Sequence, residues 1–209
     1  MGLGAIPYTV RMARWEPNAR ERLERAALAL FVEHGYDATT VAEIADRAGL
    51  TKSTFFRHFA DKREVLFGGQ DMLVDRFSAG IRTAPPSATV IECLALALES
   101  PAPIAFTPER HDLALQRRAV IAANSELLER ELLKRARLVS AMSDALRARG
   151  VDDTTALLAA EIGMLAFATA FARWVAPENR EPYTELVHEA LRDLQASATT
   201  LGADVGVRA

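Results

Sequence analysis

The chain has 209 residues, a formal charge of −3 and 50% apolar residues, which suffices for the core of one or two domains and excludes a wholly disordered chain. So small a net charge gives no indication that the protein binds nucleic acid. The one cysteine, Cys93, excludes an intrachain disulfide, and the N-terminal stretch lacks the basic and apolar regions of a secretion signal. We therefore expect a cytoplasmic protein.

The first two helices are predicted from apolar spacing and capping residues. The first begins at about Asn18, carries an apolar stripe with helical spacing and ends at Gly35. The second follows Thr40, which stands at capping-box spacing from Glu43, and it ends at Gly49. A short helix followed so closely by a glycine is typical of the first half of a helix-turn-helix motif.

The next two helices follow directly. Thr51 is placed to cap a short third helix, and Asp61 is placed to cap a fourth that we expect over 62–81. Gly68 and Gly69 interrupt the fourth helix at a cost of about 1 kcal/mol each relative to alanine. They form either a hinge or a site of close packing against the preceding helices.

Beyond the Pro85-Pro86 break the chain becomes rich in alanine and leucine, and five more helices bring the expected total to about nine. They are expected over 88–99, 108–123 (with Thr107 as cap), 125–149, 153–175 and 181–200. The sequence thus predicts an all-α fold with a leader (1–17), a helix-turn-helix head (18–80), a second helical domain (81–200) and a tail (201–209).

The third helix, within "GLTKSTFFRHF" (Gly49 to Phe59), has two distinct sides. Leu50, Phe55 and Phe59 share one face and are expected to pack into the head. The major groove of DNA offers acceptors to Lys and Arg, polar atoms to hydroxyls and a thymine methyl to apolar groups. The opposite face carries such side chains: Lys52, Ser53, Thr54, Phe56, Arg57 and His58.

These residues belong to a longer pattern. "ALALFVEHGYDA" followed by "TTVAEIADRAGLTKSTFFRHFADKREVL" resembles, from about Asn18 to Phe67, the DNA-binding domain of TetR-family transcriptional regulators. The resemblance rests on the Phe-x-x-x-Gly-Tyr end of the first helix, the Thr-x-x-x-Ile-Ala of the second, the Ala-Gly turn, and the aromatic pair followed by a further Phe and Lys62.

The resemblance implies roles for individual residues. Thr40 would cap the second helix beside a phosphate, Lys62 would clamp a phosphate, and His58 would lie near one. Base edges or backbone would be contacted by Thr51, Lys52, Ser53, Thr54 and Arg57. Where the family commonly has tyrosine this chain has Phe56, so a hydroxyl contact to phosphate is replaced by an apolar contact to thymine or by simple packing. Each of these polar side chains also has an ordinary alternative as a cap or a solvated surface residue.

The resemblance further implies a two-fold dimer formed through the last two long helices, together with a small-molecule pocket in the second domain. The helix over 153–175 is apolar nearly all round, which demands cover on two sides, from its own domain and from a partner; the alternative is a helix wholly buried in its own domain. The final helix offers a seam of Leu186, Val187, Ala190, Leu191 and Leu194. Candidate pocket residues, which are equally ordinary core residues by spacing, are Phe106, Leu115, Met142, Met164, Phe167, Phe171 and Trp174.

Catalytic and metal-binding motifs are not found, so we expect no enzyme activity, no metal and no cofactor. The stretch 156–175 is long enough to cross a bilayer, but its Glu161 and Arg173 favour a buried helix, and no membrane partner is expected. The sequence therefore predicts a homodimeric, ligand-responsive regulator, most simply a repressor released from a palindromic operator in double-stranded DNA by a hydrophobic effector, for which acyl or acyl-CoA-like compounds are candidates. The alternative is a helical small-molecule-binding or catalytic protein whose head no longer reads DNA.

Overall fold

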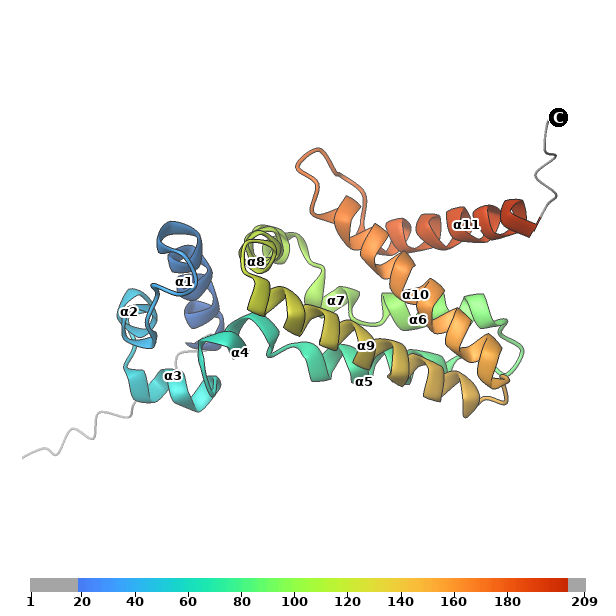
Figure 1. Ribbon diagram of the computed structural model, residues 1–209, viewed down its shortest axis with the longest axis horizontal. Coiled ribbons are helices and arrows are strands. Elements are labelled where there is room, and N and C mark those ends of the chain that lie inside the picture. Colours follow the sequence, from blue (N-terminus) through green and yellow to red (C-terminus); the bar gives the residue numbers. More distant parts are fainter. Residues whose placement is uncertain (1–18, 203–209) are drawn as a thin grey trace, which may run out of the picture.

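The computed structural model describes residues 19–202, in which helices account for all the regular structure (Figure 1). The all-α prediction is confirmed. The head comprises α1 (Ala19–His34), α2 (Val41–Arg47), α3 (Lys52–His58) and α4 (Lys62–Phe67). The body comprises α5 (Gln70–Thr83), α6 (Val90–Glu99), α7 (Ala102–Ala105), η1 (Pro108–Arg110), α8 (His111–Ala122), α9 (Ser125–Arg147), α10 (Asp153–Trp174) and α11 (Tyr183–Gly202).

Polar side chains cap six of these helices, which explains why the starts of those helices could be read from the sequence. An oxygen of each capping residue accepts a hydrogen bond from the backbone N–H three residues later, so it satisfies a donor that the first helical turn leaves free. The capping residues are Thr40, Thr51, Asp61, Thr89, Asn124 and Asp152.

Two predicted helices differ in the structure. The fourth is not continuous, because the chain breaks into α4 and α5 at Gly68 and Gly69, the residues with the weakest helix propensity in the segment. Thr107 makes no side-chain cap, and Pro108 begins a single 3-10 turn, so that α8 starts only at His111. If α4 and α5 count as one interrupted helix and the single turn α7 is set aside, the described residues contain the nine expected helices.

The molecule has two hydrophobic cores, one in the head and one in the body. Along the chain, the boundary between them lies at the break between α4 and α5. The first body residue in its core is Leu73, whereas Phe67 belongs to the core of the head. The head core is completed from the body by α8 and the start of α9, which contribute Leu113, Val120, Ile121 and Leu127. Figure 1 shows α8 lying between α1 and the rest of the body. The division of the chain at residue 80 stays a prediction, and the leader and the last residues of the tail lie outside the described residues.

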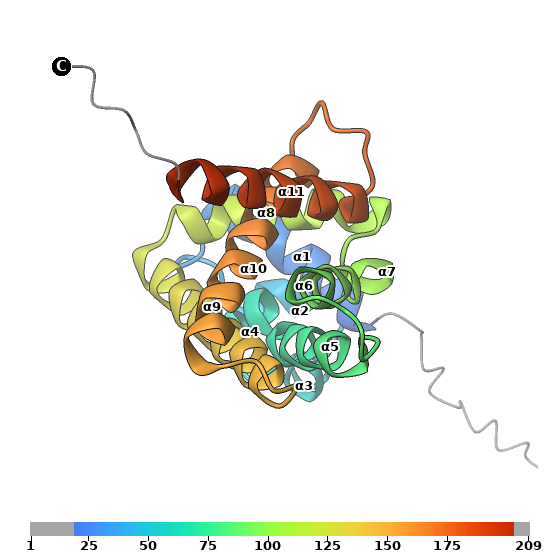
Figure 2. The ribbon, with the colours of Figure 1, turned by 90° about the vertical axis from the view of Figure 1, so that its right-hand side faces the viewer.

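The final helix lies across the top of the body in the view of Figure 2, and it corrects one expectation. Leu186, Val187, Ala190 and Leu191 are buried within the chain, where α11 packs on α10 and α6, so this seam is not left for a partner.

The helix α10 is long and apolar enough to cross a membrane by length and composition, but buried helices of soluble proteins pass the same test. It packs against α6, α9 and α11.

Candidate nucleic-acid interface

The turn between α2 and α3 is built around a left-handed residue. Gly49 has φ +65°, a conformation that costs L-residues energy and that glycine adopts freely. The amide of Leu50 then donates to the carbonyl of Ala45 at 2.8 Å, and the guanidinium of Arg22 donates to the carbonyl of Ala48. These contacts fix the direction in which α3 leaves α2.

Aromatic side chains anchor α3 to the head from below. Phe55 is fully buried, Phe59 is 3% exposed, and their ring centroids lie 5.5 Å apart. Truncating a buried phenylalanine to alanine typically costs about 3–5 kcal/mol, so this contact holds the helix firmly. Arg20 on α1 reinforces it, because its guanidinium stacks 4.6 Å over the ring of Phe59 and donates to the last helical carbonyl, that of His58, at 3.1 Å.

The anchoring leaves the opposite side of α3 in solvent. Lys52, Ser53 and Arg57 are exposed, Thr54 and His58 are half-buried, and Phe56 is 55% exposed although its ring touches the edge of the Phe55 ring. The structure therefore brings the predicted α3 residues together on one accessible face of a rigid helix. An exposed phenylalanine in such a place is available for an apolar contact.

The hydroxyl residues of this region already form hydrogen bonds within the chain in the absence of DNA. Thr51 Oγ1 accepts from the Thr54 amide at 3.1 Å and lies 3.0 Å from its hydroxyl. Thr40 and Glu43 form the predicted capping box, in which the Thr40 amide and hydroxyl both donate to Glu43 Oε2 at 2.8 Å. These hydrogen bonds lower the pKa of the Glu43 carboxyl, because they stabilise its ionised form. Contacts with DNA would add to these caps.

Lys62 lies in a different environment from the other cations. Its ammonium donates to three backbone carbonyls, those of Tyr36 (2.7 Å), Asp37 (3.1 Å) and Thr39 (3.0 Å), and it stands 4.4 Å from the centroid of the Tyr36 ring. An ammonium has three N–H donors, and here each has an acceptor. Lys62 therefore ties the loop between α1 and α2 to the start of α4, and in this arrangement it has no N–H to spare for a phosphate.

The expected pocket residues fall into two groups and one outlier. Phe106, Phe167, Phe171 and Trp174 pack ring against ring. Met142 and Met164 are buried in the adjoining core, whereas Leu115 is 38% exposed on α8.

Sequence analysis missed Tyr183, which stacks on Phe106 with ring centroids 3.9 Å apart. Its place at the first turn of α11, after Pro182, gives no sign that it faces the aromatic cluster.

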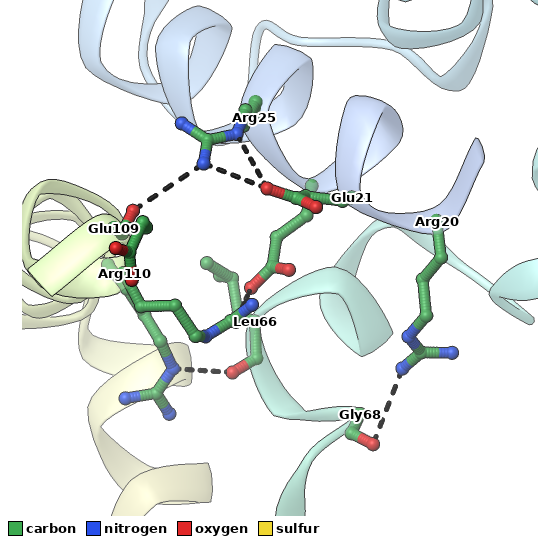
Figure 3. Close-up of polar contacts among 9 residues, drawn as sticks. Arg20, Glu21, Arg25, Leu66, Gly68, Glu109 and Arg110 are labelled. Carbon is green, nitrogen blue, oxygen red and sulfur yellow. Dashed lines mark hydrogen bonds and ion pairs between the residues drawn. The ribbon is translucent and has the colours of Figure 1, made fainter. Parts of the chain in front are cut away.

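Sequence analysis also missed the arginines that join head and body. Arg110 forms an ion pair with Glu24 of α1 at 2.8 Å, and Arg25 of α1 reaches the carbonyl of Glu109 at 3.5 Å (Figure 3). Arg117 of α8 donates to the carbonyl of Leu66 at 2.6 Å. These partners lie 51 to 86 residues apart in the sequence, so no local pattern could pair them.

Other chemistry finds little support in the described residues. Within residues 19–202 no group of three or more His, Cys, Asp and Glu side chains is placed to hold a metal ion. Cys93 is buried in the body core among apolar side chains.

Comparison with known proteins agrees with this geometry. Residues 24–67, from α1 to the end of α4, match the family described as bacterial regulatory proteins, tetR family. The transcriptional regulator TcmR of Streptomyces glaucescens is 36% identical over 36% of this chain, and the transcriptional activator FasR of Mycolicibacterium smegmatis is 40% identical over 31%. The matched segments span 33% and 30% of the length of these relatives.

Similarity in structure extends beyond the head. The TetR-family repressor FadR of Thermus thermophilus, solved in complex with lauroyl-CoA, superposes with a TM-score of 0.50 at 25% identity, over 84% of this chain and 93% of that one. The named relatives are regulators of transcription rather than enzymes.

Proposed function

Because this chain belongs to the TetR family of bacterial transcriptional regulators, we propose that it binds a palindromic operator in double-stranded DNA as a homodimer and, acting as a repressor, leaves it when a small hydrophobic effector binds the body. We further propose that it acts in the cytoplasm, where operator DNA is found.

One observation carries the proposal. The exposed face of α3 carries Lys52, Ser53, Phe56 and Arg57. On the opposite face, the buried side chains of Phe55 and Phe59 anchor the helix to the head. A helix that presents cations, a hydroxyl and an apolar ring on a rigid support matches the chemistry of the major groove. Thr40 lies at the start of α2, where backbone N–H groups favour a phosphate.

Dimerisation is supported by the free face of α10. Leu157, Leu158 and Leu165 are 51%, 60% and 49% exposed, and together with Ala168 and Ala172 they form an apolar stripe along the helix. An open hollow of about 870 Å³ lies on the same face, lined by Arg147, Asp153, Thr154, Leu157, Leu158 and Glu161. A second copy would cover this stripe, and it would double the few base contacts that one short recognition helix makes.

The effector is proposed to act through the body. Apolar and aromatic side chains dominate its interior, which favours a hydrophobic ligand. An acyl or acyl-CoA-like effector is our first candidate, in line with the lauroyl-CoA complex of the Thermus thermophilus relative. The effector would select a dimer geometry in which the two α3 helices no longer fit successive major grooves.

A mobility-shift titration with the intergenic DNA beside the protein's own gene tests this function. We expect a specific shift that weakens steeply with salt and is lost in the double variant Lys52→Ala, Arg57→Ala. Arg137→Ala, which removes an exposed cation from α9, is the matched control and should bind as the wild type does. Specific binding to no fragment, with a folded protein, would refute the proposal.

A further inference from the structure

The aromatic cluster of the body contains one residue from an irregular segment. Phe77 comes from α5, Phe167, Phe171 and Trp174 from α10, and Tyr183 from α11. Phe106 is contributed by the loop that follows α7, a helix of only one turn. It nevertheless contacts four rings of the cluster, with centroid distances of 3.9 Å to Tyr183, 5.3 Å to Trp174, 6.0 Å to Phe167 and 6.2 Å to Phe171.

The ring that stacks on Phe106, that of Tyr183, carries a buried polar atom. Tyr183 is 2% exposed, and its hydroxyl has no hydrogen-bond partner among residues 19–202. Buried hydroxyls nearly always have a partner, because leaving one without a partner destabilises the folded state. The aromatic cluster therefore contains a hydroxyl donor without an acceptor.

The charge state of that hydroxyl restricts what it can bind. Burial, and then the nearby carboxylate of Glu99, raise the pKa of Tyr183 well above its usual range, so the hydroxyl stays protonated and acts as a donor. Oε1 of Glu99 lies 2.5 Å from Nε2 of His188. A ligand carboxylate placed on Tyr183 would be repelled by Glu99, whereas an uncharged carbonyl oxygen would not.

The segment that carries Phe106 continues directly into the contacts with the head. Glu109 and Arg110 hold α1 through Arg25 and Glu24, only three and four residues after Phe106 (Figure 3). The next residue, His111, faces the cluster again, with Nε2 3.1 Å from the carbonyl of Trp174. A displacement of Phe106 would therefore also shift Glu109 and Arg110, the residues that contact α1.

We propose that Phe106 is a displaceable plug: an apolar effector with one uncharged oxygen acceptor takes the place of its ring, accepts a hydrogen bond from the Tyr183 hydroxyl, and shifts the segment that holds α1. The inference rests on the proposed ligand-responsive function and specifies its site. Aryl ketones and fatty-acyl thioesters are two sources of the same chemistry, an apolar body with a carbonyl oxygen.

The test is a binding measurement on the full chain without DNA. Trp174 reports binding by fluorescence once the other tryptophan is removed by Trp15→Phe. Acetophenone, its oxygen-free counterpart ethylbenzene, and lauroyl-CoA are the three probes. We expect acetophenone or lauroyl-CoA to lose about tenfold in affinity in Tyr183→Phe, while ethylbenzene binds that variant as it binds the wild type.

A second variant tests the plug itself. Phe106→Ala should raise the affinity for the carbonyl probe that binds, and for ethylbenzene, by about tenfold or more, because binding no longer requires the ring to leave. Phe106→Leu keeps an apolar side chain and should give an intermediate gain, which serves if the alanine variant does not fold. Equal affinities in the wild type and in both Phe106 variants would overturn the proposal, as would a carbonyl preference that survives Tyr183→Phe.

The probes also identify the source of the oxygen. Tyr183-dependent binding of acetophenone alone assigns the site to aryl ketones, and such binding of lauroyl-CoA alone assigns it to acyl thioesters. If none of the three probes binds the wild type or a folded Phe106 variant, the proposal is wrong.

The link to the head is tested separately with operator DNA. Arg110→Ala should bind the carbonyl probe as the wild type does but release DNA less completely when the probe is added; release equal to that of the wild type would remove the link from the proposal. Because probe binding is measured without DNA, its failure with intact operator binding overturns this inference and leaves the proposed function standing. Loss of operator binding with intact probe binding does the reverse.

Discussion

Replacing Lys62 with methionine separates two roles for this residue, a phosphate clamp and a tie within the head. Methionine keeps the apolar stem but removes the ammonium, and with it three hydrogen bonds of 2.7 to 3.1 Å and the contact with the Tyr36 ring. The carbonyl of Asp37 is open to water, whereas those of Tyr36 and Thr39 belong to buried residues and lose their donor.

The size of the effect follows from these contacts. Two part-buried carbonyls without a donor cost about 1–3 kcal/mol each, and the lost cation–π contact adds about 0.5–1 kcal/mol. Recovered hydration of the loop and the desolvation that a half-buried lysine no longer suffers offset part of this. We expect a fall of about 3 kcal/mol in the free energy of unfolding, or about 6–12 °C in Tm for a chain of this size.

The assay combines denaturation with the salt dependence of operator binding. A tie predicts the loss of stability and an unchanged slope of log K against log salt, whereas a phosphate clamp predicts little loss of stability and a slope smaller by about 1 per head. Lys52→Met is the matched control, because that lysine is exposed on α3 and should change the slope but not the stability. A stable Lys62→Met protein with a reduced slope would refute our reasoning.

Further predictions concern four other places. Burial lowers the pKa of Lys134 to about 8, below the 10.5 of the unfolded chain. Between these two pH values the folded state binds fewer protons than the unfolded state, so the free energy of unfolding rises with pH. Urea denaturation should show that the stability of the wild type, relative to that of Lys134→Met, rises by about 2 kcal/mol from pH 7 to pH 10. Phe56→Tyr should tighten operator binding in a mobility shift if a phosphate lies within reach, and unchanged affinity would leave the ring an apolar contact. Sedimentation of the wild type at micromolar concentration should give about twice 22.8 kDa, and Leu158→Glu should give the monomer mass; a wild-type monomer would contradict the dimer. Gly69→Ala, whose methyl group meets open space, should leave DNA binding intact and weaken effector-induced release if the break between α4 and α5 is a hinge, whereas Gly68→Ala is no clean probe because its Cβ would lie 2.8 Å from a backbone carbonyl.

The sequence predicted those parts of the head that depend on local signals. The Thr40–Glu43 box, the Thr51 cap and the Phe55 and Phe59 anchors depend on spacings of three to five residues, and the structure confirms all of them. The DNA contacts of the exposed α3 residues stay predictions.

Contacts between distant residues could not be predicted in this way. The acceptors of Lys62 lie 23 to 26 residues before it, and Arg110 meets its partner across 86 residues. The seam of α11 carried the right periodicity but gave no indication whether its cover was its own chain or another. Periodicity reports that a face is buried, and only the folded chain shows against what.

The shared core of head and α8 bears on how such regulators can be recombined. Leu113, Val120, Ile121 and Leu127 complete the apolar interior of the head, so residues 19–67 alone would leave an uncovered surface where α8 had been. A chimera that grafts this head onto the body of a relative should fold and bind its operator only if the matching face of α8 is transplanted with it. The DNA-binding head of this protein therefore cannot be transferred to another body by itself. Sequence changes in the head and in the supporting face of α8 are expected to be coupled in evolution.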